Sequence, residues 1–297
     1  IPLRLVGSEM CIRDRVKTLQ QLPGVAVGTE GMTGLYVRGG GADENLYLLD
    51  GNPVYHVNHL LGFFSAFNPD AIKNTRFYKG SFPAEYGGRL SSVVDVRMND
   101  GNRQEYHGNI SVGLLSARAN LEGPIVKDRS SFNVSVRRTW LDLITGTALA
   151  IVNKNSDTKE SFGYHFFDIN AKVNHSFSER SQAYLSFYMG QDAFRQGSKE
   201  KHEDSDDMFL WRWGNLIGSA GWNYVFGQKL FGNLMVGYSR FRSHIRQEAK
   251  GYEIEGNRAE RQSIKRDSRY KSEMEDLSVR LSVDYSLSLI HISEPTR

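Results

Sequence analysis

The second half of the chain alternates apolar and polar residues with period two over long stretches. The alternating segments are 132–137, 167–174, 182–190, 216–226, 230–238 and 277–284. Since successive side chains of a β-strand point to opposite faces of a sheet, each segment predicts a strand with one apolar and one polar face. Residues 104–286 are therefore expected to form one antiparallel sheet of about eight strands.

Periodicity alone leaves open which face of this sheet meets water. A soluble sandwich buries the apolar face against a second sheet, whereas a membrane barrel turns it toward lipid. Several segments exceed the ~5–6 residues of most soluble strands. Aromatic residues also collect near the expected strand ends, which suits the interfacial girdle of a membrane barrel. They are Trp140, Phe166, Phe177, Trp222, Tyr224, Phe226 and Tyr285.

The connections between these strands alternate in length. Tight turns are followed by long charged loops, in the order 178–180, 195–207, 227–228 and 248–273, with a further long loop at 141–163. Bacterial barrels have short periplasmic turns and long extracellular loops, so this pattern favours a membrane barrel. If the chain enters the barrel from the periplasm, residues 107–121 must form two short strands folded near Gly113. The turn at 122–129 is then also periplasmic. No run approaches the ~18 apolar residues of a transmembrane helix.

The first half of the chain predicts a small mixed α+β unit. Val16, Leu19 and Leu22 fit one face of a short helix that Pro23-Gly24 ends. The segment 68–72, Asn-Pro-Asp-Ala-Ile, carries a helix-start signature. Short strands bounded mostly by glycine-containing turns are expected at 35–37, 46–49, 72–78 and 91–98.

Both ends of the chain are expected to be foreign to the protein. Residues 4–15 read RLVGSEMCIRDR, and residues 287–297 read LSLIHISEPTR. With one choice of codons the DNA for the second segment is the reverse complement of DNA that encodes the first. This pattern is typical of translated sequencing adapter, so residues 1–15 and 287–297 are set aside as adapter-derived.

The remaining composition excludes several classes of protein. The single cysteine, Cys11, lies in the excluded head, so the rest offers no disulfide framework, thiolate metal site or cysteine nucleophile. The formal net charge of the whole chain is +3, an excess too small to indicate nucleic-acid binding.

Five segments in order carry a resemblance to a known family. They are LPGV (22–25), YVRGG (36–40), LLDGNPVY (48–55), FNPDAIKNTRFYKGSFPAEYGGRLSSVVDV (67–96) and LEGPI (121–125). Together they resemble the plug domain and plug-to-barrel junction of TonB-dependent receptors, most closely the Bacteroidetes type. The resemblance implies an α+β plug at 16–103, followed at 104–286 by the start of a transmembrane β-barrel. About eight of roughly twenty-two antiparallel strands would be present.

The function implied by the resemblance is energised uptake of a large nutrient across the outer membrane of a Gram-negative bacterium. Siderophores, cobalamin, glycans and peptides are the substrate classes that share this plug signature. The expected partners are TonB with its inner-membrane complex, outer-membrane lipid and the nutrient. The sequence does not decide whether a lipoprotein lid is a further partner, and no nucleic acid is expected. A signal peptide, a TonB box and an amino-terminal regulatory-like domain are expected to belong to the complete protein but not to this sequence. No cofactor is expected.

The resemblance also implies that plug residues hold the plug against the barrel wall through polar contacts that rearrange under a pulling force. The residues so assigned are Arg38, Gly39, Gly40, Asp50, Gly51, Glu85, Tyr86, Gly87 and Arg89. Simple surface turns are the alternative for individual side chains. A phosphate-binding loop at 38–41 is disfavoured, because the GxxxxGK[ST] and GxGxxG frames are missing and Asp43 and Glu44 follow.

Candidate substrate contacts lie in two segments that the resemblance places at plug apices facing the extracellular vestibule. They are Glu30, Met32, Tyr55, His56, Asn58 and His59. Aromatic and imidazole edges suit a bulky polar nutrient, although merely exposed loop is the alternative. The HxxH spacing of His56 and His59 is weak support for a metal site, because on a loop it fixes no geometry and no cysteine assists. We expect no metal.

The sequence offers little support for catalysis. Asp204, Asp206 and Asp207 form an acidic cluster in a charged loop, which suits a solvated surface better than a catalytic pair, and neither GxSxG nor HExxH occurs. No enzyme is expected. Two rival functions are an all-β structural or adhesive surface protein, which predicts tandem repeats that are not seen, and a soluble sugar-processing enzyme with a β-sandwich module.

Overall fold

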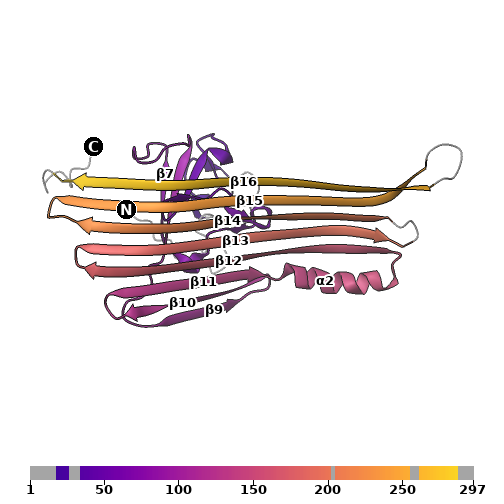
Figure 1. The fold of residues 1–297 in the computed structure, drawn as a ribbon, viewed down its shortest axis with the longest axis horizontal. Helices are drawn as coiled ribbons and strands as arrows, with labels where there is room; N and C mark the ends of the chain where they lie inside the picture. The colour runs from indigo at the N-terminus through magenta and orange to yellow at the C-terminus, as the bar shows by residue number, and fades with distance from the viewer. Residues whose placement is uncertain (1–17, 27–33, 202–204, 255–260, 287–297) are drawn as a thin grey trace.

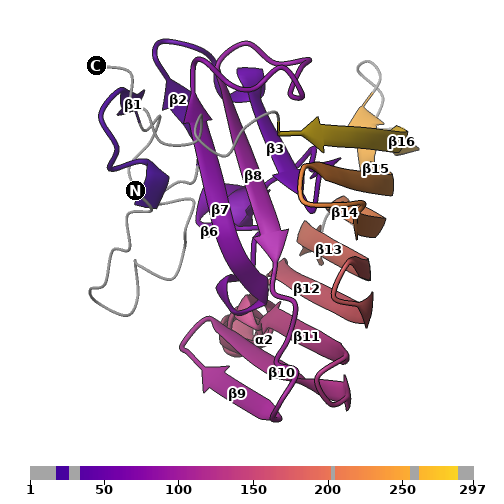
Figure 2. The same ribbon diagram turned by 90° about the vertical axis from the view of Figure 1, so that its left-hand side faces the viewer.

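A small domain lies against one face of a long antiparallel sheet (Figures 1 and 2). The computed structural model describes residues 18–26, 34–201, 205–254 and 261–286. We call the domain formed by the described residues up to 100 the plug, after the resemblance above, and the sheet the wall. This arrangement confirms the predicted α+β unit followed by an antiparallel sheet.

The plug is built on a four-stranded mixed sheet with the strand order β4-β3-β8-β7. Its strands are β3 (Asn45–Leu49), β4 (Asn52–Pro53), β7 (Ile72–Lys79) and β8 (Ser92–Met98). β3 and β8 run parallel, and the other neighbours are antiparallel. Val94 and Val96 of β8 are completely buried and pack with Leu35 and Leu49, so β8 runs through the plug core.

Short elements complete the plug. They are the strand pairs β1 (Val25–Ala26) with β2 (Tyr36–Val37) and β5 (Asn58–His59) with β6 (Phe64–Ser65), and the 3₁₀ helices η1 (Ala42–Glu44), η2 (Leu60–Gly62) and η3 (Pro69–Ala71). The Asn68 side chain accepts a 3.2 Å hydrogen bond from the Asp70 N–H, so the predicted helix start is a capped 3₁₀ turn. Thr18 and Leu19 are helical, and the chain turns at Gly24 with φ of 77°.

The wall contains eight consecutive antiparallel strands, as predicted. They are β9 (His107–Val112), β10 (Ser116–Val126), β11 (Ser130–Thr139), β12 (Thr158–Ser178), β13 (Ser181–Glu200), β14 (Asp206–Val225), β15 (Leu230–Ile254) and β16 (Arg261–Tyr285). β9 and β10 fold back on each other at Gly113, as predicted, but β10 continues to Val126, so the turn predicted at 122–129 is confined to 127–129. The helix α2 (Leu141–Val152) and the 3₁₀ turn η4 (Asn153–Asn155) connect β11 to β12.

The polar face of the wall lies toward the plug. Buried polar residues recur at alternate positions of β11 and β12, among them Asn133, Ser135, Asp168 and Asn170. The opposite face is apolar and exposed along several strands. Its exposed residues include Val134, Val136, Val173, Leu185, Phe187, Trp222, Val236, Leu277, Val279, Leu281 and Val283. A soluble sandwich would bury this apolar face, so the sandwich alternative does not describe the molecule.

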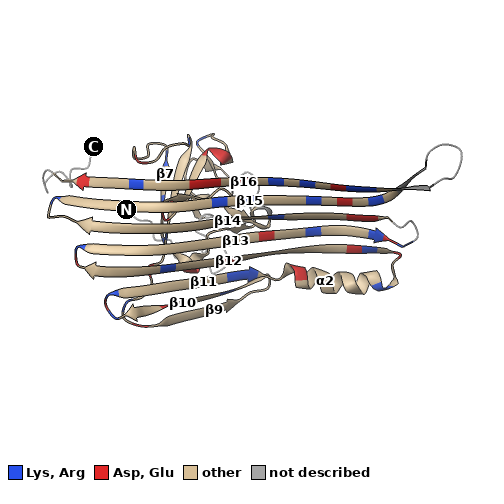
Figure 3. Ribbon diagram, viewed as in Figure 1, with Lys and Arg blue, Asp and Glu red and all other residues tan. Residues whose placement is uncertain are grey.

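The predicted long loops are wrong in extent. Residues 195–207 and 248–273 belong largely to paired strands, since β13 and β14 pair from Lys199 with Asp206, and β15 and β16 pair from Ile254 with Arg261. The segment 141–163 contains a helix and the start of β12. Charged side chains alternate on these extensions and hide the apolar periodicity that marks a strand. They concentrate on the end of the wall that carries α2 (Figure 3).

Four of the aromatic residues assigned to the girdle are exposed at the tight-turn end of the wall, and one assignment is wrong. Phe177, Trp222, Phe226 and Tyr285 are exposed there. Phe166, in contrast, is completely buried on the plug-facing side, because its even position in β12 shares the face of Asp168 and Asn170. No helix among the described residues is long and apolar enough to cross a membrane.

Candidate functional site

The centre of the plug–wall interface is His59, which bridges two acidic residues of the wall. Its Nδ1 lies 2.6 Å from Asp192 Oδ2, and its Nε2 lies 2.8 Å from Asp168 Oδ1. The imidazole stacks on Phe166 at 4.2 Å between ring centroids and 5° between planes. His59 is only 3% exposed, so the structure places this predicted substrate contact inside the interface and not on an open apex.

Arg137 of β11 provides the second positive charge of this cluster. Its guanidinium lies 2.5 Å from Asp168 Oδ2, donates a 2.7 Å hydrogen bond to the Ser65 carbonyl of the plug, and sits 5.0 Å from the Phe166 ring centroid. The Tyr164 hydroxyl donates to Asp192 and accepts a 2.5 Å hydrogen bond from the Leu60 N–H. Buried carboxylates are therefore met by cations and hydroxyl donors, as burial of charge requires.

The surroundings of His56 and His59 set the charge of each imidazole ring. Burial alone would lower the pKa of His59, but the carboxylates of Asp168 and Asp192 outweigh it and raise the pKa to about 9. His59 is thus an imidazolium at neutral pH. Burial lowers the pKa of His56, whose ring lies 6.0 Å from Trp213 and 5.9 Å from Phe241, so His56 is neutral.

A second ionic contact joins the plug to the wall at Lys172 of β12. Its ammonium lies 3.3 Å from Asp50 Oδ1, 3.0 Å from Asp100 Oδ1 and 3.2 Å from the Met98 carbonyl. Asp50 is 1% exposed, has φ of 46°, and also accepts a hydrogen bond from the Met98 N–H. Burial opposes ionisation of Asp100, but Lys172 and Lys73 outweigh it and lower the pKa of that carboxyl.

Asn52 makes the closest neutral contact with the wall. It is completely buried, its amide nitrogen donates to the Ser219 hydroxyl, and its amide oxygen accepts a 3.1 Å hydrogen bond from Ser278 Oγ. Gly237 of β15 leaves the space that this side chain fills, since an added Cβ would overlap the amide oxygen. Nearby, Gly51 has φ of 86° and packs against Met235.

Tyr55 and His56, two further predicted apex residues, also touch the wall. The Tyr55 hydroxyl donates to Asp276 of β16. The His56 carbonyl accepts a 2.6 Å hydrogen bond from Asn215 Nδ2. Asn58 pairs with Ser65 in the small β5–β6 ribbon. Glu30 and Met32 lie outside the described residues.

The remaining predicted plug residues lie within the plug. Arg38 (φ of 52°) and Gly39 (φ of 84°) form a turn, and the Arg38 guanidinium covers Gly80. Gly40 packs against Ser91 and Glu44.

Tyr86 is buried in the cluster of Leu48 and Val93, and its hydroxyl lies 3.4 Å from Asp95. Glu85, Gly87 and Arg89 are exposed, and among the described residues none of the three makes a hydrogen bond or ion pair with a wall strand. Their assigned role against the barrel stays a prediction.

An aromatic strip lines the plug-facing side of the wall toward the α2 end. We define it as Phe162, Phe194, Phe209, Trp211 and Phe241. Phe194 lies 5.5 Å from Phe162 and 6.0 Å from Phe209 between ring centroids. Trp211 Nε1 donates a 3.0 Å hydrogen bond to Ser243 Oγ. Phe194, Trp211 and Phe241 pack on the cluster that also holds Leu60 and Phe64 of the plug, so the strip adjoins the predicted apex.

Several interface residues were missed by sequence reasoning. They are Asn52, Asn68, Arg137, Asp168, Lys172, Asp192 and Ser219, and Asn68 donates a 2.6 Å hydrogen bond to Ser135 Oγ. For the wall residues the available signal was their place on the polar side of the strands, whereas Asn52 and Asn68 lie in the plug segments that carry the family resemblance. Among the described residues, no group of three or more His, Cys, Asp or Glu side chains is arranged to hold a metal ion.

The comparisons with known proteins agree with this architecture. A family model described as the TonB-dependent Receptor Plug Domain matches residues 13–94. No curated protein matches the chain.

Three solved receptor structures are similar to this chain, and one of them reaches a TM-score above 0.5. The unliganded ferric citrate transporter FecA is 9% identical, with a TM-score of 0.51 over 92% of this chain and 51% of that chain. The siderophore receptor PirA from Pseudomonas aeruginosa (15% identity, TM-score 0.41, 94% and 60% covered) and the outer membrane transporter YddB from Escherichia coli (10%, 0.47, 94% and 53%) are also similar.

The chain spans 60% or less of the length of these three receptors. At such low identity the likeness to FecA shows the fold alone. The match over residues 13–94 identifies this part of the chain as a TonB-dependent receptor plug domain, and the plug seated on the polar face of an antiparallel wall agrees with that match.

Proposed function

We propose that the complete protein is an outer-membrane receptor for energised uptake of a large nutrient. The observation that carries the proposal is the orientation of the wall, whose polar face packs on the plug while its apolar face is exposed. An exposed apolar face of this extent suits lipid, and a polar interior suits an aqueous passage. The tight-turn end is then periplasmic and the α2 end extracellular.

The plug closes the passage through contacts that are mainly hydrogen bonds and ion pairs. Each such hydrogen bond contributes only about 0.5–1.5 kcal/mol net, because water replaces it when it breaks. A pull on the plug can therefore exchange them for water one after another. The His59, Lys172 and Asn52 contacts would be the ones that such a pull disrupts.

The domain limits follow as part of the proposal, with the plug at 16–103 and the start of the barrel at 104–286. β9 and β16 are the outermost strands of the described sheet. An open strand edge is not tolerated in lipid, so further strands of the complete protein are expected to close the barrel. TonB and its inner-membrane complex supply the pull on the plug. A lipoprotein that covers the barrel as a lid is a candidate further partner.

The aromatic strip and the 55–58 segment of the plug form the candidate ligand surface. Rings at the passage wall suit a ligand with apolar faces, which is compatible with siderophore, cobalamin, glycan and peptide classes. The family is one of receptors and transporters, and we assign this protein no enzymatic step and no cofactor.

The test is expression of the complete gene, followed by membrane fractionation and uptake assays with and without TonB. The proposal predicts that the product sits in the outer membrane and that uptake of its nutrient stops when TonB is deleted. A product found in the soluble fraction would overturn the proposal. An outer-membrane product that supports no TonB-dependent uptake would favour the structural or adhesive alternative.

A further inference from the structure

The outward face of β14 and β15 changes from apolar to basic at one level along the strands. From Phe226, just after β14, back to Leu216, the outward positions are apolar or small, a span that fits the ~9–11 residues of a transmembrane strand. The next charged outward residue of β14 is Arg212. On β15 the change falls between Tyr238 and Arg240, directly beside Leu216 in the register. The wall therefore carries a defined upper boundary to its lipid-facing band.

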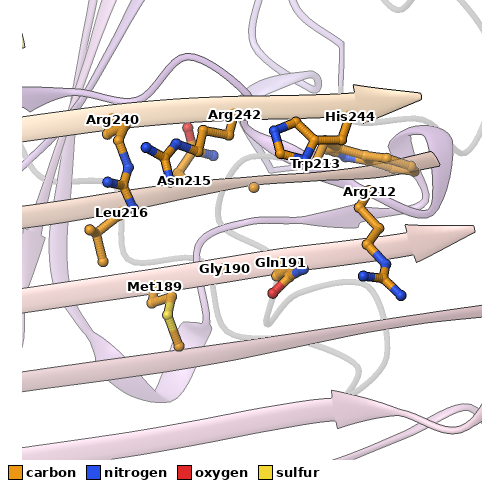
Figure 4. A pocket seen from close by; sticks show the side chains of 11 residues that line it. Met189, Gly190, Gln191, Arg212, Trp213, Asn215, Leu216, Arg240, Arg242 and His244 are labelled. Atoms are coloured by element: carbon orange, nitrogen blue, oxygen red, sulfur yellow. The ribbon is translucent and has the colours of Figure 1, made fainter. Parts of the chain in front are cut away.

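A groove of about 290 Å³ lies at this boundary (Figure 4). Arg212, Arg240, Arg242 and His244 line it together with Met189 and Leu216, which belong to the apolar band. The register places Leu216 beside Arg240 and Arg212 beside His244, so the basic residues occupy consecutive rows on the outward face. The groove thus joins a cationic upper part to an apolar lower part.

The acidic neighbours compensate only part of this charge. Arg242 forms an ion pair with Glu273, and Glu275 stands opposite Arg240 and accepts a 3.0 Å hydrogen bond from Tyr238. In the part of the chain that the structure describes, no carboxylate is paired with Arg212. Three arginines against two glutamates leave the groove cationic even with His244 neutral.

We propose that this groove binds the phosphate groups of lipid headgroups in the outer leaflet of the outer membrane. Guanidinium groups match phosphate oxygens in pairs, and each basic residue near an anionic membrane surface adds to the binding. Met189 and Leu216 would meet the acyl chains below the headgroup. The inference rests on the proposed outer-membrane location, but it concerns the face of the wall opposite to the plug.

The experiment uses the complete receptor, purified in neutral detergent, with three probes. They are bisphosphorylated lipid A, the same lipid A with its phosphates removed, and inorganic phosphate. We expect bisphosphorylated lipid A to bind and the other two to bind far more weakly. Equal binding of the dephosphorylated lipid would overturn a phosphate site, and equal binding of inorganic phosphate would overturn the assignment to a lipid. This comparison needs no variant.

A matched pair of triple variants locates the site. Arg212→Gln, Arg240→Gln and Arg242→Gln together should weaken binding of bisphosphorylated lipid A about a hundredfold. The control is Lys199→Gln, Lys250→Gln and Lys265→Gln, which removes the same charge from one row farther from the band. If both triple variants lost lipid A binding equally, the loss would reflect net charge alone, and the proposed site in the groove would be overturned. Uptake by the arginine variant should persist, so loss of lipid binding alone is distinguishable from failure of the proposed function.

Discussion

Asn52 of the plug occupies the space that Gly237 of the wall leaves open, so that its amide reaches Ser219 and Ser278 on either side. The contact depends on a missing side chain. Replacing Gly237 by alanine would put a methyl group into the amide oxygen and force the plug loop away from the wall. We expect Gly237→Ala to lower the free energy of unfolding by about 2–4 kcal/mol, through loss of these hydrogen bonds and incomplete burial.

Gly218→Ala is the control for this substitution. Gly218 lies on the neighbouring strand, and an added Cβ there meets nothing within 4 Å. Thermal unfolding of the complete receptor measures stability, and ion conductance in planar bilayers measures closure of the passage. Gly237→Ala should melt earlier and leak, whereas Gly218→Ala should behave as wild type. Equal behaviour of the two variants would remove Asn52 from the interface that keeps the plug seated.

The imidazolium of His59 makes plug seating depend on pH. Because its pKa is raised from 6.5 to about 9, the stabilisation is complete below pH 6.5 and is lost as the pH rises through about 9. His59→Gln removes the charge and leaves two buried carboxylates with one arginine, which should cost about 3–5 kcal/mol at pH 6. The stability difference between wild type and variant should shrink from pH 6.5 toward pH 10, measured by thermal unfolding. A difference that stays constant over that range would contradict the charged state of His59.

The alternation of the strands made the wall and its two faces predictable, because a period of two residues is a local property of the sequence. The partners of His59 were not predictable. Asp168 and Asp192 occur in the sequence as ordinary polar positions of an alternating strand, and only the register of β12 with β13 brings both to one imidazole. Phe166 was misassigned for a related reason, since an aromatic near a strand end suits a girdle and a buried stack equally well.

Lys172 should be energetically coupled to Asp50 across the interface. Lys172→Met leaves Asp50 and Asp100 without their shared cation, and Asp50→Asn keeps the side-chain shape and tolerates φ of 46°. In a double-mutant cycle of these two substitutions we expect a coupling free energy of about 1–3 kcal/mol from denaturant unfolding. A coupling near zero would mean that the 3.3 Å contact contributes nothing.

Protonation of Asp100 should weaken the Lys172 contact at low pH. Its pKa is lowered, so its contribution is present above its ordinary pKa of 3.8 and is lost as the pH falls through the lowered value. Lys172→Met should therefore flatten the loss of stability below pH 4. An unchanged acid profile would assign that loss to other carboxylates.

Leu185 distinguishes lipid from water as the environment of the outward face. It is 64% exposed on β13, in register with Val173 on one side and Ala220 on the other, at the middle of the apolar band. In water, replacing an exposed leucine by arginine changes stability by less than about 0.5 kcal/mol, whereas at the middle of a bilayer it costs about 2–4 kcal/mol.

Met208→Arg is the control, because Met208 shares the outward face of the wall but lies beyond the band, next to Asp207. Unfolding of the complete receptor from lipid vesicles should show the full cost for Leu185→Arg and almost none for Met208→Arg. Equal, small effects at both positions would mean that the apolar face does not meet lipid.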